Sequence, residues 1–221
     1  MMFAISLGDD ADDADDADDA IGRDGGERGD GSGHAGQANH RGRGGEGAEL
    51  RPLEVWHAEE FLAHMDRARA LVDPWIPLAS FATDADSARA LLLRYAEKQA
   101  NDTGRLYGIW LDGTLVGGVL FRIFEADSGN CEIGCWLEPA GEGRGLVTRA
   151  ARKLIDWAVH ERGMHRVEWQ ATSTNTRSIA VARRLGMRRD GVLRQSYLYR
   201  GERYDSEVWS VLAPEWRAWN A

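Results

Sequence analysis

The chain has 221 residues, of which 36 are Asp or Glu and 27 are Lys or Arg, giving a formal net charge of −9. No apolar run approaches the ~20 residues that a membrane-spanning helix needs. The apolar start is also too short for a signal peptide and lacks its basic residues. These features argue against membrane insertion and export, and we expect a cytoplasmic protein that has no membrane partner.

The first 48 residues differ in composition from the rest. Residues 9–20 repeat Asp-Asp-Ala, residues 22–47 are rich in Gly, Arg, Asp and His, and all nine tryptophans lie beyond residue 48. This segment holds 12 acidic and 4 basic residues, so it supplies most of the net charge. We expect residues 1–48 to form a disordered acidic, glycine-rich tail that contributes nothing to a core, and residues 49–221 to form one domain.

The first half of this domain has signals for an antiparallel sheet and two helices. Asp112-Gly113 is a typical hairpin turn between two apolar runs. In chain order we expect a strand at 50–53, a helix at 58–70, a break at Pro74 to Pro77, a helix at 84–99, and strands at 106–111, 115–124 and 130–137.

The second half begins with an amphipathic helix that should pack on this sheet. Its apolar residues follow helical spacing at Val147, Ala150, Ala151, Leu154, Ile155 and Ala158. We then expect a strand at 166–171 that is parallel to the strand before the helix, a helix capped by Asn175 and ended by Gly186, and strands at 192–199 and 203–212. The predicted fold class is α/β, or mixed α+β: one domain with a central, mostly antiparallel, twisted sheet and helices on both faces.

Cysteine and histidine patterns exclude two kinds of site. Cys131 and Cys135 lie four apart on one expected strand, a separation too long for a disulfide. No His or Cys cluster has metal-ligand spacing, so we expect no metal site. The chain also lacks Gly-x-Ser-x-Gly, which leaves covalent hydrolase chemistry without support.

Residues 141–147, Gly-Glu-Gly-Arg-Gly-Leu-Val, lie between a strand and the amphipathic helix. Glycines allow amide groups to converge on an anion, and the helix dipole adds positive potential there. A P-loop is excluded because no Lys follows until Lys153, and a dinucleotide fingerprint because Leu146 replaces its third Gly. We therefore expect another phosphorylated ligand at this loop.

Charge is distributed unevenly over the domain. Residues 142–194 carry 12 Lys or Arg against 5 Asp or Glu, whereas the rest of residues 49–221 carries 11 against 19. The basic segment fits a polyphosphate ligand, and the acidic remainder would attract a cationic acceptor. The alternative is that these arginines lie on solvated helix faces. The domain itself is near neutral, which argues against direct nucleic-acid binding.

Four sequence blocks follow one another between residues 49 and 216: Glu132-Ile-Gly-Cys-Trp-Leu-Glu-Pro, Glu142-Gly-Arg-Gly-Leu-Val-Thr, Asn175-Thr-Arg-Ser-Ile-Ala-Val-Ala-Arg-Arg-Leu-Gly-Met and Gly191-Val-Leu-Arg. Together they resemble the GNAT N-acetyltransferase superfamily, in the RimJ/RimL-like branch that acetylates the N-termini of ribosomal proteins. Three residues depart from the pattern: Glu142 stands for Gln or Arg, Val147 for Gly or Ala, and Tyr197 for a Glu found in some RimL-type enzymes.

The resemblance implies a splayed parallel strand pair, acetyl-CoA or another acyl-CoA as co-substrate, and a set of residues that hold it. Asn175 and Ser178 would lie beside the thiol, although each also suits a local role, as a helix cap or a backbone contact. Trp136, Leu137 and Glu138 would bind the pantetheine arm. The diphosphate would be held by Gly143, Arg144, Gly145, Leu146, Val147, Thr148 and Arg149.

The same resemblance suggests catalytic roles. Glu132 matches the position of a general base, with a cross-strand charge partner as the alternative. An amide near Leu137 would hold the thioester carbonyl, and Ser178 would protonate the leaving thiolate. Tyr197 would either protonate the sulfur or pack in the acceptor cleft. An α-amine suits this chemistry, because its pKa near ~8 leaves more free base than the ~10.4 of Lys.

The expected activity is transfer of acetyl from acetyl-CoA to a primary amine, on a protein N-terminus or a small molecule. Two alternatives stay open: transfer of succinyl or another acyl group, and a CoA-binding domain without catalysis. A homodimer is a further possibility, because Trp209, Trp216 and Trp219 would suit either a dimer contact or the core.

Overall fold

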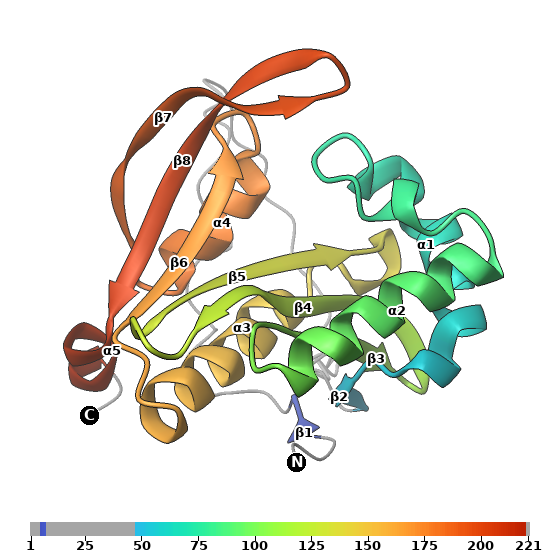
Figure 1. Ribbon diagram of the computed structural model, residues 1–221, viewed down its shortest axis with the longest axis horizontal. Coiled ribbons are helices and arrows are strands. Elements are labelled where there is room, and N and C mark those ends of the chain that lie inside the picture. Colours follow the sequence, from blue (N-terminus) through green and yellow to red (C-terminus); the bar gives the residue numbers. More distant parts are fainter. Residues whose placement is uncertain (1–4, 8–46, 220–221) are drawn as a thin grey trace, which may run out of the picture.

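The computed structural model describes residues 5–7 and 47–219, which form one eight-stranded sheet with helices on both faces (Figure 1). The strand order is β1-β2-β3-β4-β5-β6-β8-β7, and of the neighbouring pairs only β5 and β6 are parallel. The strands are β1 (Ile5–Ser6), β2 (Ala48–Pro52), β3 (Arg105–Leu111), β4 (Thr114–Glu125), β5 (Asn130–Leu137), β6 (Arg166–Thr172), β7 (Arg188–Tyr199) and β8 (Glu202–Leu212).

Five α-helices cover the two faces of the sheet, which confirms the predicted fold class. Helices α1 and α2 pack in one apolar cluster that includes Phe61 and Leu92, and α3, α4 and α5 pack in a second that includes Leu154 and Trp216. Helix α5 is not among the elements expected from the sequence. The helices are α1 (Ala58–Val72), α2 (Ala85–Ala100), α3 (Leu146–Asp156), α4 (Thr176–Arg184) and α5 (Ala213–Trp219), with short 3-10 turns at Val55–His57, Ala79–Phe81 and Pro139–Gly141 and a π-helical turn at Trp157–Glu161.

Helix boundaries follow the capping signals in the sequence. Helix α2 begins after Asp84, whose carboxylate accepts a hydrogen bond from the Ser87 amide in a capping box. Helix α4 begins after Asn175, whose Oδ1 accepts from the Ser178 amide at 3.1 Å. Gly186, with φ of +68°, follows the end of α4 in the left-handed conformation that favours glycine.

Strands β5 and β6 separate part of the way along their length. They pair from Asn130 opposite Arg166 to Ile133 opposite Trp169, and no pairing continues to the end of either strand. Strand β4 stays paired with β5 as far as Leu137, whereas β6 leaves with β8 and β7 as a separate arm (Figure 1). The splay opens a gap between the arms just before the glycine loop, and it places that loop and α4 on either side of the gap.

One expectation about the core was wrong, and for two tryptophans the core alternative is confirmed. Leu7 is 1% exposed and its amide donates to Ala48 O at 2.9 Å, so this part of the expected tail joins the sheet and core. Trp209 and Trp216 are buried, which removes them from any dimer contact, whereas Trp219 is exposed. The expected disorder of the tail falls on residues 8–46, which lie outside the described residues, and the homodimer stays a prediction.

Within residues 5–7 and 47–219, no helix is long and apolar enough to cross a membrane. In the same residues, no group of three or more His, Cys, Asp or Glu side chains is arranged to hold a metal ion.

Candidate active site

A cavity of about 920 Å³ lies at the splay between β5 and β6. Its walls come from β5, the glycine loop, the starts of α3 and α4, α2, and the loop between α1 and α2. Three of the residues predicted for the site, Glu138, Arg144 and Arg149, do not line it. The predicted residues that do are Glu132, Trp136, Leu137, Gly143, Gly145, Leu146, Val147, Thr148, Asn175, Ser178 and Tyr197.

The free edge of β5 presents backbone groups to this cavity. The Glu138 amide donates to Val116 O on the β4 side at 2.8 Å. Because hydrogen bonding alternates along an antiparallel pair, the backbone groups of Leu137 and Cys135 point to the opposite edge. Beyond Ile133 that edge has no β6 partner. Leu137 and Cys135 therefore offer amide groups that a ligand in the gap can reach.

Glu138 has partners within the chain for its amide, carbonyl and carboxylate, and its expected contact with the cofactor stays a prediction. Its amide and carbonyl are both used within the chain, by Val116 O and by the Gly141 amide. Its carboxylate, 3% exposed, accepts from Arg67 Nε at 2.9 Å and lies 2.9 Å from His64 Nδ1. The side chain therefore fastens the end of β5 to helix α1.

His64 completes this buried network. Its Nε2 accepts a hydrogen bond from Trp136 Nε1 at 2.9 Å, so the ring proton is on Nδ1, toward Glu138. Burial lowers the pKa of His64, an effect that the nearby Glu138 carboxylate only partly offsets. A neutral His64 therefore joins α1 to both Trp136 and Glu138, the residues on either side of Leu137.

The glycine loop owes its shape to backbone conformation. Gly143 and Gly145 have φ of +70° and +66°, and Gly145 is the N-cap of α3. A Cβ at Gly143 would meet nothing within 4 Å, so the conformation rather than crowding requires glycine there. Arg149 is the first residue whose amide bonds back into the helix, to Gly145 O at 3.0 Å. The amides before it have no intrahelical partner and suit an anion.

Arginines from α4, rather than from the loop, lie beside these amides. Arg177 forms an ion pair with Glu142, and Arg184 Nε donates to Thr148 Oγ1 at 3.3 Å. Both line the cavity, whereas Arg149 is 5% exposed and does not. The charge of Glu142, one of the departures from the family pattern, is thus matched by Arg177. Both arginines lie in the block that begins at Asn175, where no signal in the sequence distinguishes them from the neighbouring Arg183.

At least half of the other ten basic residues between 142 and 194 have partners elsewhere in the fold, so their number is a poor guide to the charge at the loop. Arg162 pairs with Asp102, Arg166 with Glu168 and Asp190, Arg188 with Glu215 and Arg189 with Glu207, and Arg183 lies over the Trp209 ring. Only Arg177 and Arg184 of this segment line the cavity. A local excess of charge therefore overstated the positive potential at the loop.

Ser178 presents its hydroxyl to the cavity with a fixed neighbour behind it. Its Oγ accepts a hydrogen bond from Trp169 Nε1 at 2.9 Å, and Trp169 is 1% exposed. Since one oxygen lone pair is occupied, the hydroxyl proton is free to point toward an acceptor in the cavity. Asn175, one turn earlier, caps the helix and lines the same cavity.

Glu132 is 6% exposed and faces Arg122 on the neighbouring strand. Arg122 donates through Nε to Oε1 at 2.5 Å and through Nη2 to Oε2. These contacts raise the pKa of Arg122 above its usual value. A carboxylate has about four acceptor positions, so this fork leaves some of them to a water or an amine. Both readings of Glu132, base and charge partner, therefore fit the geometry.

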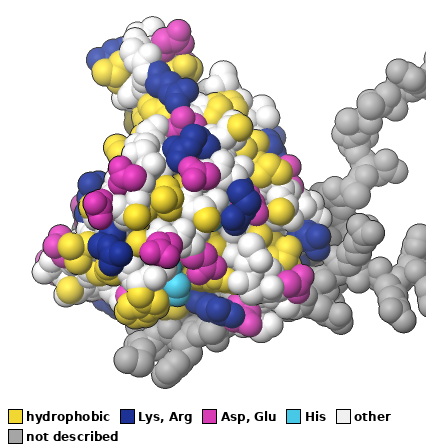
Figure 2. All heavy atoms as spheres, turned by 90° about the vertical axis from the view of Figure 1, so that its right-hand side faces the viewer, with side chains coloured by type: hydrophobic (Ala, Val, Ile, Leu, Met, Phe, Trp, Pro, Cys, Tyr) yellow, Lys and Arg dark blue, Asp and Glu magenta, His cyan; other side chains and the backbone are white. Residues whose placement is uncertain are grey.

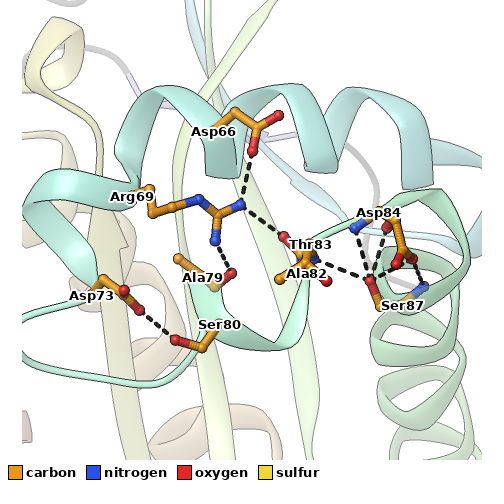
Figure 3. Close-up of polar contacts among 9 residues, drawn as sticks. All are labelled: Asp66, Arg69, Asp73, Ala79, Ser80, Ala82, Thr83, Asp84 and Ser87. Carbon is orange, nitrogen blue, oxygen red and sulfur yellow. Dashed lines mark hydrogen bonds and ion pairs between the residues drawn. The ribbon is translucent and has the colours of Figure 1, made fainter.

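The opposite wall of the cavity is the loop between α1 and α2, which is held by side chains (Figure 3). Arg69 donates to the carbonyls of Ala79 and Ala82 and pairs with Asp66. Ser80 Oγ donates to Asp73 at 2.6 Å. These bonds place the rings of Trp75 and Phe81, which line the cavity.

The β7–β8 hairpin reaches this loop and closes that end. Tyr197 donates its hydroxyl proton to Trp75 O at 3.2 Å, and Tyr199 donates to Asp73 O at 2.6 Å. Arg200 pairs with Asp73. Because the Tyr197 proton is directed at a carbonyl, this geometry favours the packing role over the role of acid.

Comparisons with known proteins agree with this geometry. A family model described as "Acetyltransferase (GNAT) domain" matches residues 48–188. The chain is 30% identical over 172 residues to "Putative ribosomal N-acetyltransferase YdaF" of Bacillus subtilis (strain 168), an alignment that covers 76% of this chain and 92% of that protein.

Two solved structures share the fold. The ribosomal α-N-protein acetyltransferase RimL in complex with coenzyme A superposes with a TM-score of 0.72 at 18% identity, covering 76% of this chain and 94% of that one. Mycobacterium smegmatis RimJ in complex with CoA-disulfide superposes with a TM-score of 0.70 at 22% identity, covering 76% and 83%. The chain belongs to the GNAT acetyltransferase family and is an acetyl-CoA-dependent N-acetyltransferase.

Proposed function

We propose that the enzyme transfers acetyl to the α-amine of a protein N-terminus, by direct attack in a ternary complex. The observation that carries this proposal is a single cavity with the free edge of β5 on one side and the glycine loop and Ser178 on the other. The name of YdaF points to a ribosomal acceptor. A small-molecule amine and another acyl donor are the alternatives that the experiments below separate.

The donor would bind along the open edge of β5. Its pantetheine amides would pair with the backbone of Cys135 and Leu137, as an added strand does. Its diphosphate would accept from the amides between Gly143 and Thr148, with Arg177 and Arg184 beside it. Gly143 fits this role because its α-carbon faces open space and its backbone is already in the required conformation.

The transfer itself needs three groups. The amine nitrogen bonds to the thioester carbonyl carbon while the Leu137 amide stabilises the charge that develops on the oxygen. The amine proton passes to Glu132 along a chain of cavity waters, the last of which is held by its unused acceptor positions. As the carbon–sulfur bond breaks, Ser178 gives its hydroxyl proton to the thiolate and is reprotonated from solvent. An α-amine needs only this modest base, because much of it is neutral near pH 8.

The location of the cofactor is tested by two matched substitutions, Gly143→Ala and Gly113→Ala. Both glycines have positive φ and open space around the α-carbon, so each change should cost a similar ~1 kcal/mol of stability. Only Gly143→Ala should weaken acetyl-CoA binding, by at least ~10-fold in calorimetry. Unchanged affinity in Gly143→Ala would refute the placement of the diphosphate.

The activity is tested by mass spectrometry of N-terminal peptides and of small amines incubated with acetyl-CoA or succinyl-CoA. We expect a mass increase of one acetyl group on the α-amine of a peptide. Modification of lysine side chains alone, or transfer of succinyl alone, would contradict the proposal. Binding of acetyl-CoA without transfer to any acceptor would instead support a non-catalytic domain.

A further inference from the structure

One stripe of helix α2 lines the acceptor end of the cavity and changes character along its length. Leu91, Arg94, Tyr95 and Lys98 are spaced as one helical face, and all four line the cavity. The stripe is apolar at Leu91 and then cationic at Arg94 and Lys98. The outer surface on this side of the molecule mixes Lys and Arg with Asp and Glu (Figure 2). Arg94 and Lys98 therefore lie on the face of α2 that lines the cavity.

The two cations lie against aromatic rings and close to a third cation. Arg94 is over the Phe81 ring, 6.0 Å from its centroid, and Lys98 is over the Tyr95 ring at 5.5 Å. Lys98 Nζ donates to Arg122 O at 2.8 Å. Burial lowers the pKa of Lys98, and the charges of Arg122 and Arg94 lower it further. The lowered pKa agrees with this crowding of positive charge.

The carboxylates at the cavity are already occupied. Among its described lining residues, the carboxylates are Glu132, which binds Arg122, and Glu142, which binds Arg177. In the part of the chain that the structure describes, neither Arg94 nor Lys98 has a carboxylate partner. Like charges four residues apart also destabilise a helix slightly. An anion supplied by a ligand would offset this cost.

The distance from the two cations to the thioester carbonyl decides whether they can bind an anion on the acyl donor or one on the acceptor. Lys98 binds the backbone of Arg122, whose side chain binds Glu132. Glu132 is five residues before Leu137 on β5, or about 16 Å along a strand. The four carbons of a succinyl group are too short to cover that distance from the carbonyl. An extended peptide covers it in about five residues. The cations therefore suit the acceptor better than the acyl donor.

We infer that the acceptor is an acidic N-terminal peptide, and that Arg94 and Lys98 bind a carboxylate in its first five or so residues. This inference rests on the proposed function and names its substrate class. It reverses the expectation that an acidic domain attracts a cationic acceptor, because the charge that faces the acceptor is positive.

The test uses hexapeptides with N-terminal Ser and either Glu or Gln at positions three to five. The α-amine is the same in both, so kcat/KM compares only the distal charge. We expect the wild-type enzyme to prefer the Glu peptide by at least ~10-fold. Arg94→Gln should bring the ratio toward one, and Arg94→Glu should shift preference to a Lys peptide. Arg89→Gln is the matched control, because Arg89 is exposed on the same helix and does not line the cavity.

Three results would overturn the inference. The first is equal kcat/KM for the Glu and Gln peptides in the wild-type enzyme. The second is a preference that Arg94→Gln and Lys98→Gln both leave intact. The third is loss of succinyl transfer in Arg94→Gln with an unchanged peptide ratio, which would assign the cations to the donor. If no peptide is acetylated although the enzyme binds acetyl-CoA, the proposed function itself is refuted.

Discussion

The glycine loop and the α1–α2 loop line opposite ends of one cavity, and they hold their shapes by different means. The first is set by two left-handed glycines and a helix start, all within a few residues of one another. The second is set by Arg69 and by tyrosines that reach it from more than 120 residues away in the sequence. The shape of the proposed donor site is therefore set locally, whereas that of the proposed acceptor site depends on side chains brought together by the whole fold.

This difference predicts which substitutions affect which substrate. Changes that alter the glycine loop should weaken binding of the donor, and changes that loosen the α1–α2 loop should weaken binding of the acceptor. His64 belongs to neither end, because it ties α1 to the end of β5 between them.

The largest expected effect is on folding, from His64→Leu. The change leaves Trp136 Nε1 without an acceptor and removes a buried partner of Glu138, which should cost about 3 kcal/mol of unfolding free energy. Urea unfolding at pH 8 measures it. His57→Leu is the control, since His57 is only partly buried in a short 3-10 turn. A loss below ~1 kcal/mol would show that the network adds little.

The same network predicts a pH dependence. Burial lowers the pKa of His64 in the folded state, and in the unfolded state it returns to about 6.5. The unfolded chain therefore binds the proton more readily than the folded chain. The contribution of His64 to the free energy of unfolding is complete above pH ~6.5 and is lost as pH falls toward the folded pKa. The groups that act on His64 are Glu138, Arg67 and Glu60. His64→Leu should have a flatter stability profile below pH 6.5 than wild type, and an identical profile would contradict this.

The next largest effect is expected from Glu132→Gln, which keeps the shape of the side chain and removes its basicity. We expect kcat to fall at least ~100-fold with little change in acetyl-CoA affinity. Glu168→Gln is the control, because Glu168 is opposite Glu132 in the β5–β6 register but does not line the cavity. Turnover like that of wild type would leave Glu132 only the role of partner to Arg122.

Local signals allowed much of the cofactor end to be predicted from the sequence. The apolar stripe of α3, the cap at Asn175 and the positive φ of Gly186 each depend on neighbours within one or two turns. The contacts of Glu138 could not be predicted, because its partners, His64 and Arg67, are more than 70 residues away. The number of basic residues was a poor guide for the same reason, since most of the partners found for them lie on other strands and helices.

The acceptor end had no sequence signal of its own. From the sequence alone, Arg94 and Lys98 are indistinguishable from ordinary charges on an exposed helix face. Their position at the cavity is evident only when α2 is placed against β5. Leu7 was likewise hidden in a segment whose composition favours disorder, because a single strand pair with β2 is too short to show periodicity. Side chains that act through distant contacts require the fold before their roles can be assigned.

A smaller effect is expected from Ser178→Ala. Losing the proton donor should lower kcat about 10-fold. An acyl donor whose thiolate is a better leaving group should restore part of the lost kcat. Trp169→Phe is the companion variant, because it keeps the hydroxyl and removes only the bond that orients it. Its kcat should fall less than that of Ser178→Ala. Equal losses would assign Ser178 a structural role through Trp169.

Arg69→Met tests the acceptor wall directly. It removes the bonds to the carbonyls of Ala79 and Ala82, so the loop that carries Phe81 should become less ordered. We expect the acceptor KM to rise about fivefold while the acetyl-CoA affinity stays within twofold of wild type. Arg89→Met is the matched control on the outside of α2. A rise in the dissociation constant of acetyl-CoA instead would show that the two ends are not separable.

The smallest effect is expected from Tyr197→Phe, which separates the two roles proposed for this residue. Burial raises the pKa of Tyr197, and its hydroxyl already donates to Trp75 O. If it only packs, losing one hydrogen bond should raise the acceptor KM about two- to threefold and leave kcat unchanged. Tyr204→Phe is the control, since Tyr204 is on the same hairpin and bonds only to exposed Glu202. A tenfold fall in kcat would return the role of acid to Tyr197, because packing alone cannot slow the chemical step without weakening the acceptor.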